Sequence, residues 1–169
     1  GEGGGFKEIT DYSMEFGADT GDDLPSAQWK LKMTLDKVMN DDWDFIFRTN
    51  ASSYIDKKRL IEFAEALPKT KCYCGIDGCG FASGAGFFIS RDCAQILASQ
   101  IQPEMPADLI EDVYLGTILS KNGICVTPGA KRLAYPADRL TKGYHYRCKG
   151  PTGDRNTDIE AFNWLFENN

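Results

Sequence analysis

Three short segments of the sequence carry groups that could do chemistry. Residues 48–54, RTNASSY, place an amide and several hydroxyls where a short apolar run ends. Residues 82–86, ASGAG, have almost no side chains, which permits close approach to the backbone. Glu111 and Asp112 add two carboxylates, groups that can accept a proton near neutral pH. These are the residue types of a polar binding or catalytic site.

Each segment also has a purely structural explanation. Residues 50–53 fit an ordinary turn, because Asn and Ser hydrogen-bond the local backbone. ASGAG fits a tight bend or a bulge within a strand. Glu111 and Asp112 fit acids that balance the dipole at the start of a helix. At this level both interpretations stay open.

Hydrophobic periodicity predicts the elements that position these segments. Apolar residues at helical spacing predict helices at 25–40, 55–68, 90–100, 107–123 and 156–169, with Asp56 and Ser90 as caps. Short apolar or alternating runs predict strands at 12–19, 43–49, 73–75, 81–90, 124–128 and 144–149. This alternation predicts an α/β fold with a mostly parallel sheet, flanked by helices in three layers. Ligands of such sheets bind at the carboxyl ends of the strands.

Composition limits the classes of protein and partner. A chain of 169 residues with 42% apolar content is expected to form a single domain, 1–169. The net charge of −6 argues against a nucleic-acid partner, because such proteins attract phosphates with basic surfaces. No apolar run approaches the roughly 18 residues of a membrane span, and no signal pattern opens the chain. A soluble chain is expected, with cytoplasmic and lumenal locations both open.

The six cysteines do not have the spacing of a zinc site. Cys72, Cys74 and Cys79 cluster, but paired CxxC knuckles are missing from the sequence. Two interpretations remain: a disulfide within the cluster, or reduced thiols packed as small apolar groups.

The segments occur in an order that resembles a known family. A strand with a polar end and a helix precede FASGAGFFISRD at 81–92 and EDVYLG at 111–116. This order is similar to the A-type nucleotide-sugar glycosyltransferases, most of all to the Fringe and β-1,3-galactosyltransferase group with its viral and bacterial relatives. The resemblance runs from about Leu31 to Ile124. It implies an A-type fold and an inverting transferase that moves a sugar from a nucleotide-diphosphate sugar, expected to be a UDP-sugar, to a hydroxyl of a glycan or glycoconjugate.

The resemblance also implies roles for single residues. Asp112 matches the family's base, which deprotonates the acceptor hydroxyl, and Glu111 lies beside it toward the acceptor. The small-residue segment at 83–86 matches a loop next to the donor and acceptor sugars. Contacts to the donor are expected from Lys32, Arg48, Thr49, Asn50, Ser52, Ser53, Ser83, Gly84, Ala85, Gly86, Arg147 and Lys149.

The sequence departs from the family at the metal motif. The family's strand ends in acids that hold a divalent metal, usually manganese, against the two phosphates of the donor. This chain has RTNAS at 48–52 where RTDDD would be expected. An amide and a hydroxyl are weaker ligands than carboxylates for a hard cation, so the usual metal site is not expected here.

A basic strand near the C-terminus is the alternative source of positive charge. His145, Arg147 and Lys149 alternate onto one face of the strand at 144–149. The resemblance implies a role for them, because metal-free members of this fold meet the charge of the leaving diphosphate with basic side chains from the C-terminal region. Arg and Lys there could hold the departing diphosphate. Two other interpretations stay open, namely an edge strand that shows its charges to water and His145 as a metal ligand.

A further departure concerns the start of the chain. The family usually opens with a nucleotide-binding strand, helix and strand that have no counterpart before Leu31. Either this unit is abbreviated or the chain is a fragment truncated at its N-terminus. The competing functional hypothesis is a non-catalytic, glycosyltransferase-like module that only binds carbohydrate.

Overall fold

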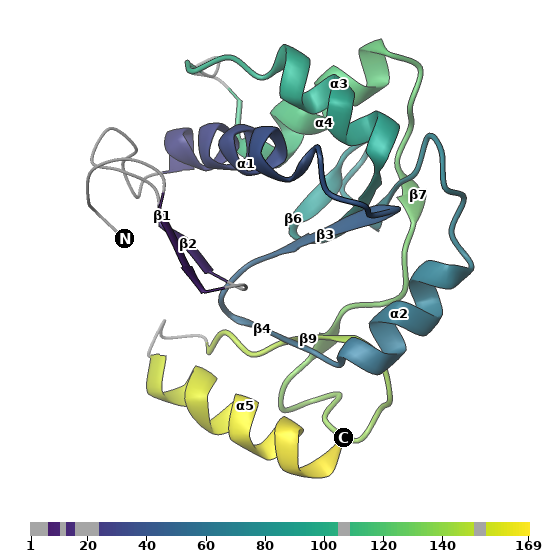
Figure 1. The fold of residues 1–169 in the computed structure, drawn as a ribbon. Coiled ribbons are helices and arrows are strands. Elements are labelled where there is room, and N and C mark those ends of the chain that lie inside the picture. Colours follow the sequence, from purple (N-terminus) through teal and green to yellow (C-terminus); the bar gives the residue numbers. More distant parts are fainter. Residues whose placement is uncertain (1–6, 11–12, 16–23, 105–108, 151–154) are drawn as a thin grey trace.

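The computed structural model describes residues 7–10, 13–15, 24–104, 109–150 and 155–169. Its helices are α1 (Leu24–Val38), α2 (Lys57–Glu65), α3 (Arg91–Gln100), α4 (Glu111–Lys121) and α5 (Arg155–Asn168). Its strands are β1 (Lys7–Thr10), β2 (Ser13–Glu15), β3 (Phe45–Thr49), β4 (Ser53–Ile55), β5 (Tyr73–Asp77), β6 (Ala82–Ser90), β7 (Thr127–Pro128), β8 (Leu133–Ala134) and β9 (His145–Arg147). The chain is therefore a small α/β protein, as the alternating pattern predicts (Figure 1).

The central sheet is mixed, so the prediction of a mostly parallel sheet is wrong. Its strand order is β3-β6-β5-β7, and β6 runs antiparallel to both β3 and β5. Only β5 and β7 pair in parallel within this sheet. Strands β5 and β6 are joined by a tight turn in which Gly78 N donates to Phe81 O at 2.7 Å. A connection this short can join only antiparallel neighbours.

Helices cover both faces of the central sheet, which confirms the three-layer arrangement. Helices α1, α3 and α4 lie on one face and α2 on the other (Figure 1). The larger core includes Leu35, Leu97 and Leu115 from the three helices, together with Phe87 and Ile89 from β6. The smaller core packs α2 against the opposite face of the same strands. This packing holds β6 rigidly, because it is covered on both faces.

A second sheet lies beside the C-terminal end of β3. Its order is β4-β9-β8, and α5 covers one face through Leu133, Tyr146 and Tyr54. Side chains alternate along a strand, so His145 and Arg147 lie on the opposite face, with Ser53 paired to Arg147 and Ile55 to His145. We call this opposite face the inner face, because His145 there contacts Phe47 of the central sheet.

Several boundaries differ from the prediction. Strand β4 was not predicted, so the second helix begins at Lys57, and its predicted cap Asp56 is confirmed by a bond from Arg59 N. The Ser90 side chain does not cap α3 and accepts from Cys72 N instead. Strand β6 includes ASGAG, and its register with β5 shifts across this segment. Residue 12 and residues 16–19 of the first predicted strand lie outside the described residues, and all six cysteines are free thiols.

Candidate functional site

The structure brings the three polar segments together around Arg48, at the end of β3. Arg48 Nη1 donates to Gly84 O at 2.6 Å, and Arg48 Nη2 lies 2.7 and 2.6 Å from the two carboxylate oxygens of Glu111. These contacts join β3, β6 and the first turn of α4. Both charges are therefore engaged inside the protein, and the predicted contacts of Arg48 to a donor and of Glu111 to an acceptor stay predictions.

Asp112 lies next to this ion pair and faces the small-residue segment of β6. Its Oδ2 accepts from Gly84 N at 3.1 Å, and its Oδ1 accepts from Val113 N at 3.1 Å. The carboxylate is half-buried and sits in the first turn of α4, where the helix dipole favours negative charge. It is thus held in one orientation with an open side.

The small residues of β6 permit these close contacts. A Cβ atom on Gly84 would lie 2.7 Å from Arg48 Nη1, closer than a carbon and a nitrogen can approach. Thr49 Oγ1 donates to Ala85 O at 2.8 Å, which ties the strand tip to the same segment. Ser83 Oγ accepts from Ala85 N at 3.4 Å and stays half-buried. The register between β5 and β6 shifts between the pairs Gly75–Phe87 and Asp77–Ala82, which fits the bulge interpretation of ASGAG, and Gly86 of the segment pairs with Thr49 of β3.

Residues 50–53 form a turn, as the structural interpretation predicts. Ser53 N donates to Asn50 O at 3.2 Å, and Ser53 Oγ donates to Asn50 Oδ1 at 2.9 Å. Ser52 Oγ accepts from Arg155 Nη1 of α5 at 2.9 Å. Because its Oδ1 is engaged, Asn50 is left with an amide Nδ2 that has no hydrogen bond to the described residues. A donor group at the strand tip suits an anion better than a cation.

The His145 side chain contacts this turn. Its Nε2 lies 3.0 Å from Ser53 Oγ, and its ring contacts Phe47 and stacks on Tyr144. Since the Ser53 hydroxyl donates to Asn50, the imidazole donates through Nε2. A Cβ atom on Gly86 would lie 2.5 Å from His145 Cε1, so only glycine leaves room for the ring.

A metal does not fit this donor set. The strand tip offers an amide N–H, a turn of engaged hydroxyls and an imidazole that donates, whereas a hard divalent cation needs several acceptor oxygens. The described residues hold no cluster of three or more His, Cys, Asp or Glu suited to a metal ion.

Burial lowers the pKa of His145 to about 4, with a further contribution from the charges of Arg132 and Arg147. We expect its Hε1 NMR signal, the only histidine signal of the chain, to stay unshifted from about pH 7.5 to about pH 5.5. The unfolded chain binds the proton near pH 6.5, so stability is full above that pH and falls as the pH drops toward about 4. Between about pH 7 and pH 5 the loss should reach about 2 kcal/mol.

Urea unfolding at both pH values measures this loss, and His145→Gln should remove most of it. A folded-state NMR titration centred near the ordinary histidine value would contradict the buried, neutral imidazole.

The basic residues only partly follow the prediction. Arg147 lies on the inner face of β9, but β9 ends there, and Lys149 is exposed beyond it. Strand β9 is the middle strand of its sheet, so the alternative of an exposed edge strand is wrong. Lys32 pairs with Asp36 at 2.5 Å and lies over the Trp29 ring, turned to its own helix.

Two basic residues that the sequence did not single out lie near the predicted site residues. Lys30 of α1 lines a hollow of about 460 Å³ together with Arg48 and Thr49. Arg132 lies near His145 and Arg147, since its charge acts on both. Lys30 lies on the same helix as Lys32. The helical spacing of the two residues was the signal that could have shown which of them faces β3. Arg132 precedes a strand of two residues, which leaves no periodic pattern to read.

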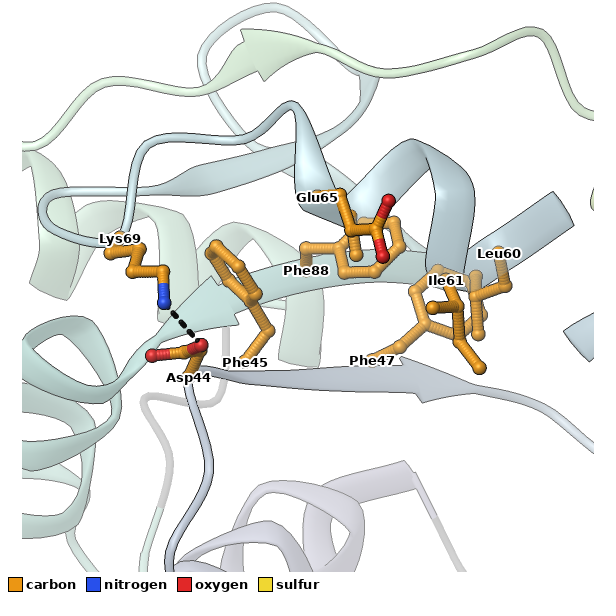
Figure 2. Close-up of a pocket in the computed structure, with 9 residues that line it drawn as sticks. Asp44, Phe45, Phe47, Leu60, Ile61, Glu65, Lys69 and Phe88 are labelled. Carbon is orange, nitrogen blue, oxygen red and sulfur yellow. Dashed lines mark hydrogen bonds and ion pairs between the residues drawn. The ribbon is translucent and has the colours of Figure 1, made fainter. Parts of the chain in front are cut away.

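A second hollow lies elsewhere. It has a volume of about 500 Å³ and sits between α2 and β3, lined by Phe45, Phe47, Leu60, Ile61, Ala64 and Phe88 (Figure 2). The ion pair of Lys69 and Asp44, 2.7 Å long, closes one end. Because its lining is apolar and excludes Asp112, this hollow does not bear on the proton chemistry of the site.

No family model and no curated protein sequence matches the chain. Within the described residues, no helix has the length and apolar character to pass through a membrane. A function for the chain must therefore rest on the geometry around Asp112.

Proposed function

We propose that the chain is an inverting glycosyltransferase that moves a sugar from a nucleotide-diphosphate sugar to a hydroxyl of a carbohydrate acceptor. The observation that carries the proposal is the placement of Asp112. Its carboxylate is fixed by Gly84 N against a strand segment without bulky side chains, beside the polar tip of β3. A substrate hydroxyl can approach a carboxylate held in this way.

The reaction follows from the groups at hand. Asp112 accepts the proton of the acceptor hydroxyl as the hydroxyl oxygen attacks the anomeric carbon. The new carbon–oxygen bond forms while the bond from that carbon to the diphosphate oxygen breaks, and its electron pair leaves with the nucleoside diphosphate. Attack from the side opposite the leaving group inverts the anomeric carbon. No covalent intermediate with the protein is needed.

The remaining residues position the donor and balance charge. The Asn50 side-chain amide offers neutral N–H donors to phosphate oxygens. Ser52 and Ser53 lie in the same turn and hold it in place. Cations of the inner face, Arg147 first among them, offset the charge that grows on the leaving diphosphate. Arg48 and Glu111 hold β6 and α4 at the distance this arrangement needs.

Turnover of nucleotide sugars tests the proposal. The protein is incubated with UDP-, GDP-, ADP- and CMP-linked sugars, with and without manganese and with a chelator, and release of the nucleotide is measured. We expect release from a nucleoside-diphosphate sugar that persists in chelator. Release that requires manganese would contradict the metal-free chemistry. The absence of release from every donor would contradict the proposal that the chain is an enzyme.

A carbohydrate-binding module is the second candidate. It is favoured by the internal hydrogen bonds of both acids, since Glu111 is paired with Arg48 and Asp112 with Gly84 N. Saturable glycan binding combined with an absence of turnover for every donor would select this alternative.

A further inference from the structure

Strand β3 forms an open edge of the central sheet. It is the first strand in the order β3-β6-β5-β7, and among the described residues only β6 pairs with it. Helices α1 and α2 lie on its two faces (Figure 1), yet all five residues of β3 are only half-buried. Phe87, Phe88 and Ile89 of the neighbouring β6 are almost fully buried. The exposure of β3 therefore comes from its free side, which we call the β3 edge.

The pairing register shows which backbone groups point out of the β3 edge. Ser90 N donates to Cys72 O, on the side of β5, at 3.0 Å, so the backbone groups of Ser90 face away from β3. Ser90 is the register partner of Phe45, and backbone direction alternates along a strand. The N–H and C=O groups of Phe45, Phe47 and Thr49 therefore point outward. No described residue forms a hydrogen bond with them there.

A hollow flanks the β3 edge on each face of the sheet. The hollow of about 500 Å³ lies on the α2 face, where Phe45 and Phe47 line it together with apolar side chains of α2 (Figure 2). The hollow of about 460 Å³ lies on the α1 face, where Ile46 and Arg48 line it together with Lys30. A strand added beside β3 would direct alternate side chains to these two faces. Both faces offer space for them.

The β3 edge lacks the features that usually keep a free strand from pairing. Such strands are protected by proline, by exposed charges or by bulges. The sequence of β3, FIFRT, contains no proline, and its register with β6 is regular throughout. Its one charged side chain, Arg48, is paired with Glu111 inside the protein. The β3 edge is thus suited to pairing with another chain.

We propose that the β3 edge binds an extended segment of a partner protein, which pairs with β3 as an additional strand. Main-chain bonds to Phe45, Phe47 and Thr49 supply affinity, and alternate side chains in the two hollows supply specificity. The segment carries apolar residues on the α2 face, where the hollow is apolar. On the α1 face it carries an acidic residue, which complements the charge of Lys30. This interaction does not rest on the proposed function.

A second copy of the chain suits the β3 edge less well than a single segment. The side chains of its own β3 are already packed in its own cores, Ile46 in the larger one and Phe45 and Phe47 in the smaller one. They cannot also fill the hollows of a neighbour. An extended segment without covering helices has both of its faces free for this purpose.

Selection of random peptides of about seven residues, displayed on phage, against the full chain tests the proposal. We expect enriched sequences in which apolar residues alternate with at least one Asp or Glu. An enriched peptide with a fluorescent label should bind saturably in an anisotropy titration. Ile61→Lys places a charge at the apolar hollow and should weaken this binding at least about ten-fold.

Matched variants separate a lost site from a damaged fold. Ile61 is 59% exposed, so its replacement should leave the melting temperature nearly unchanged. Ile159→Lys is the control, since Ile159 of α5 is 56% exposed and lines neither hollow. Lys30→Glu should weaken binding of the acidic peptide about ten-fold, and a peptide with Lys in place of the acid should restore it. Lys37→Glu, on the exposed side of the same helix, should have little effect.

Residue-resolved amide exchange, measured by NMR, locates the bound peptide. Without peptide, the amides of Phe45, Phe47 and Thr49 should exchange faster than those of Ile46 and Arg48, which face β6. With peptide, exchange of the first three should slow at least about ten-fold.

Three results would overturn the docking site: no enrichment of alternating peptides, equal weakening by Ile159→Lys, or protection of other amides instead. Light scattering that shows a dimer whose contact already protects the amides of Phe45, Phe47 and Thr49 would overturn the partner segment in favour of a second copy.

Discussion

Replacement of Asp112 by Asn should lower the rate of sugar transfer by about 10²–10⁴-fold, the usual contribution of a general base. The amide keeps an oxygen for Gly84 N, now 3.1 Å from Asp112 Oδ2, so the local fold should survive. It cannot take the proton of an acceptor hydroxyl. Donor binding does not use that proton, and the dissociation constant of the donor should therefore stay nearly unchanged.

Single-turnover rates and donor affinity, measured on the same preparation, check this expectation. Asp44→Asn is the matched control, because Asp44 is exposed at the end of the apolar hollow and its partner among the described residues is Lys69. An Asp112→Asn variant that transfers at the wild-type rate would show that another group accepts the proton. Loss of donor binding in that variant would point to a structural role instead.

Glu111→Gln should lower the free energy of unfolding by about 3 kcal/mol. The Glu111 side chain is 9% exposed and that of Arg48 is 22% exposed, so the variant leaves a largely buried guanidinium without its counter-charge. Loss of one partner of a buried ion pair typically costs about 3–5 kcal/mol, and the partial exposure of Arg48 places this pair at the low end.

Urea unfolding of a double-mutant cycle measures the coupling. Arg48→Met should also destabilise the fold, and Arg48→Met combined with Glu111→Leu should cost clearly less than the sum of the single variants. The exposed pair of Lys69 and Asp44 is the comparison, and Asp44→Asn should cost far less than Glu111→Gln. Additive single effects at Arg48 and Glu111 would contradict a coupled pair.

Hydrophobic periodicity predicted the helices because a buried helical face repeats locally. Helix α5 spans Arg155–Asn168 against a predicted 156–169, and Asp56 caps α2 as expected. Strand direction has no such local signal. The direction of β6 relative to its neighbours depends on the connections between the strands. The tight turn between β5 and β6 makes these two strands antiparallel, and β6 also runs antiparallel to β3. The mostly parallel sheet was for this reason a wrong prediction.

The candidate site was likewise predictable only in part. Polar residues at 48–54, 82–86 and 111–112 were visible in the sequence, and the structure brings them together. The pair of Arg48 and Glu111 was not predictable, because the two residues lie 63 positions apart and each suited a ligand equally well. Arg132 was missed because a strand of two residues shows no alternation.

The anomeric configuration of the transferred sugar tests the central claim most directly. Proton NMR of a running reaction with the donor that turns over, recorded in chelator, reports the first product formed. The account predicts a product anomer opposite to that of the donor, formed without manganese and lost in Asp112→Asn. A first product with the configuration of the donor would contradict single displacement with Asp112 as the base.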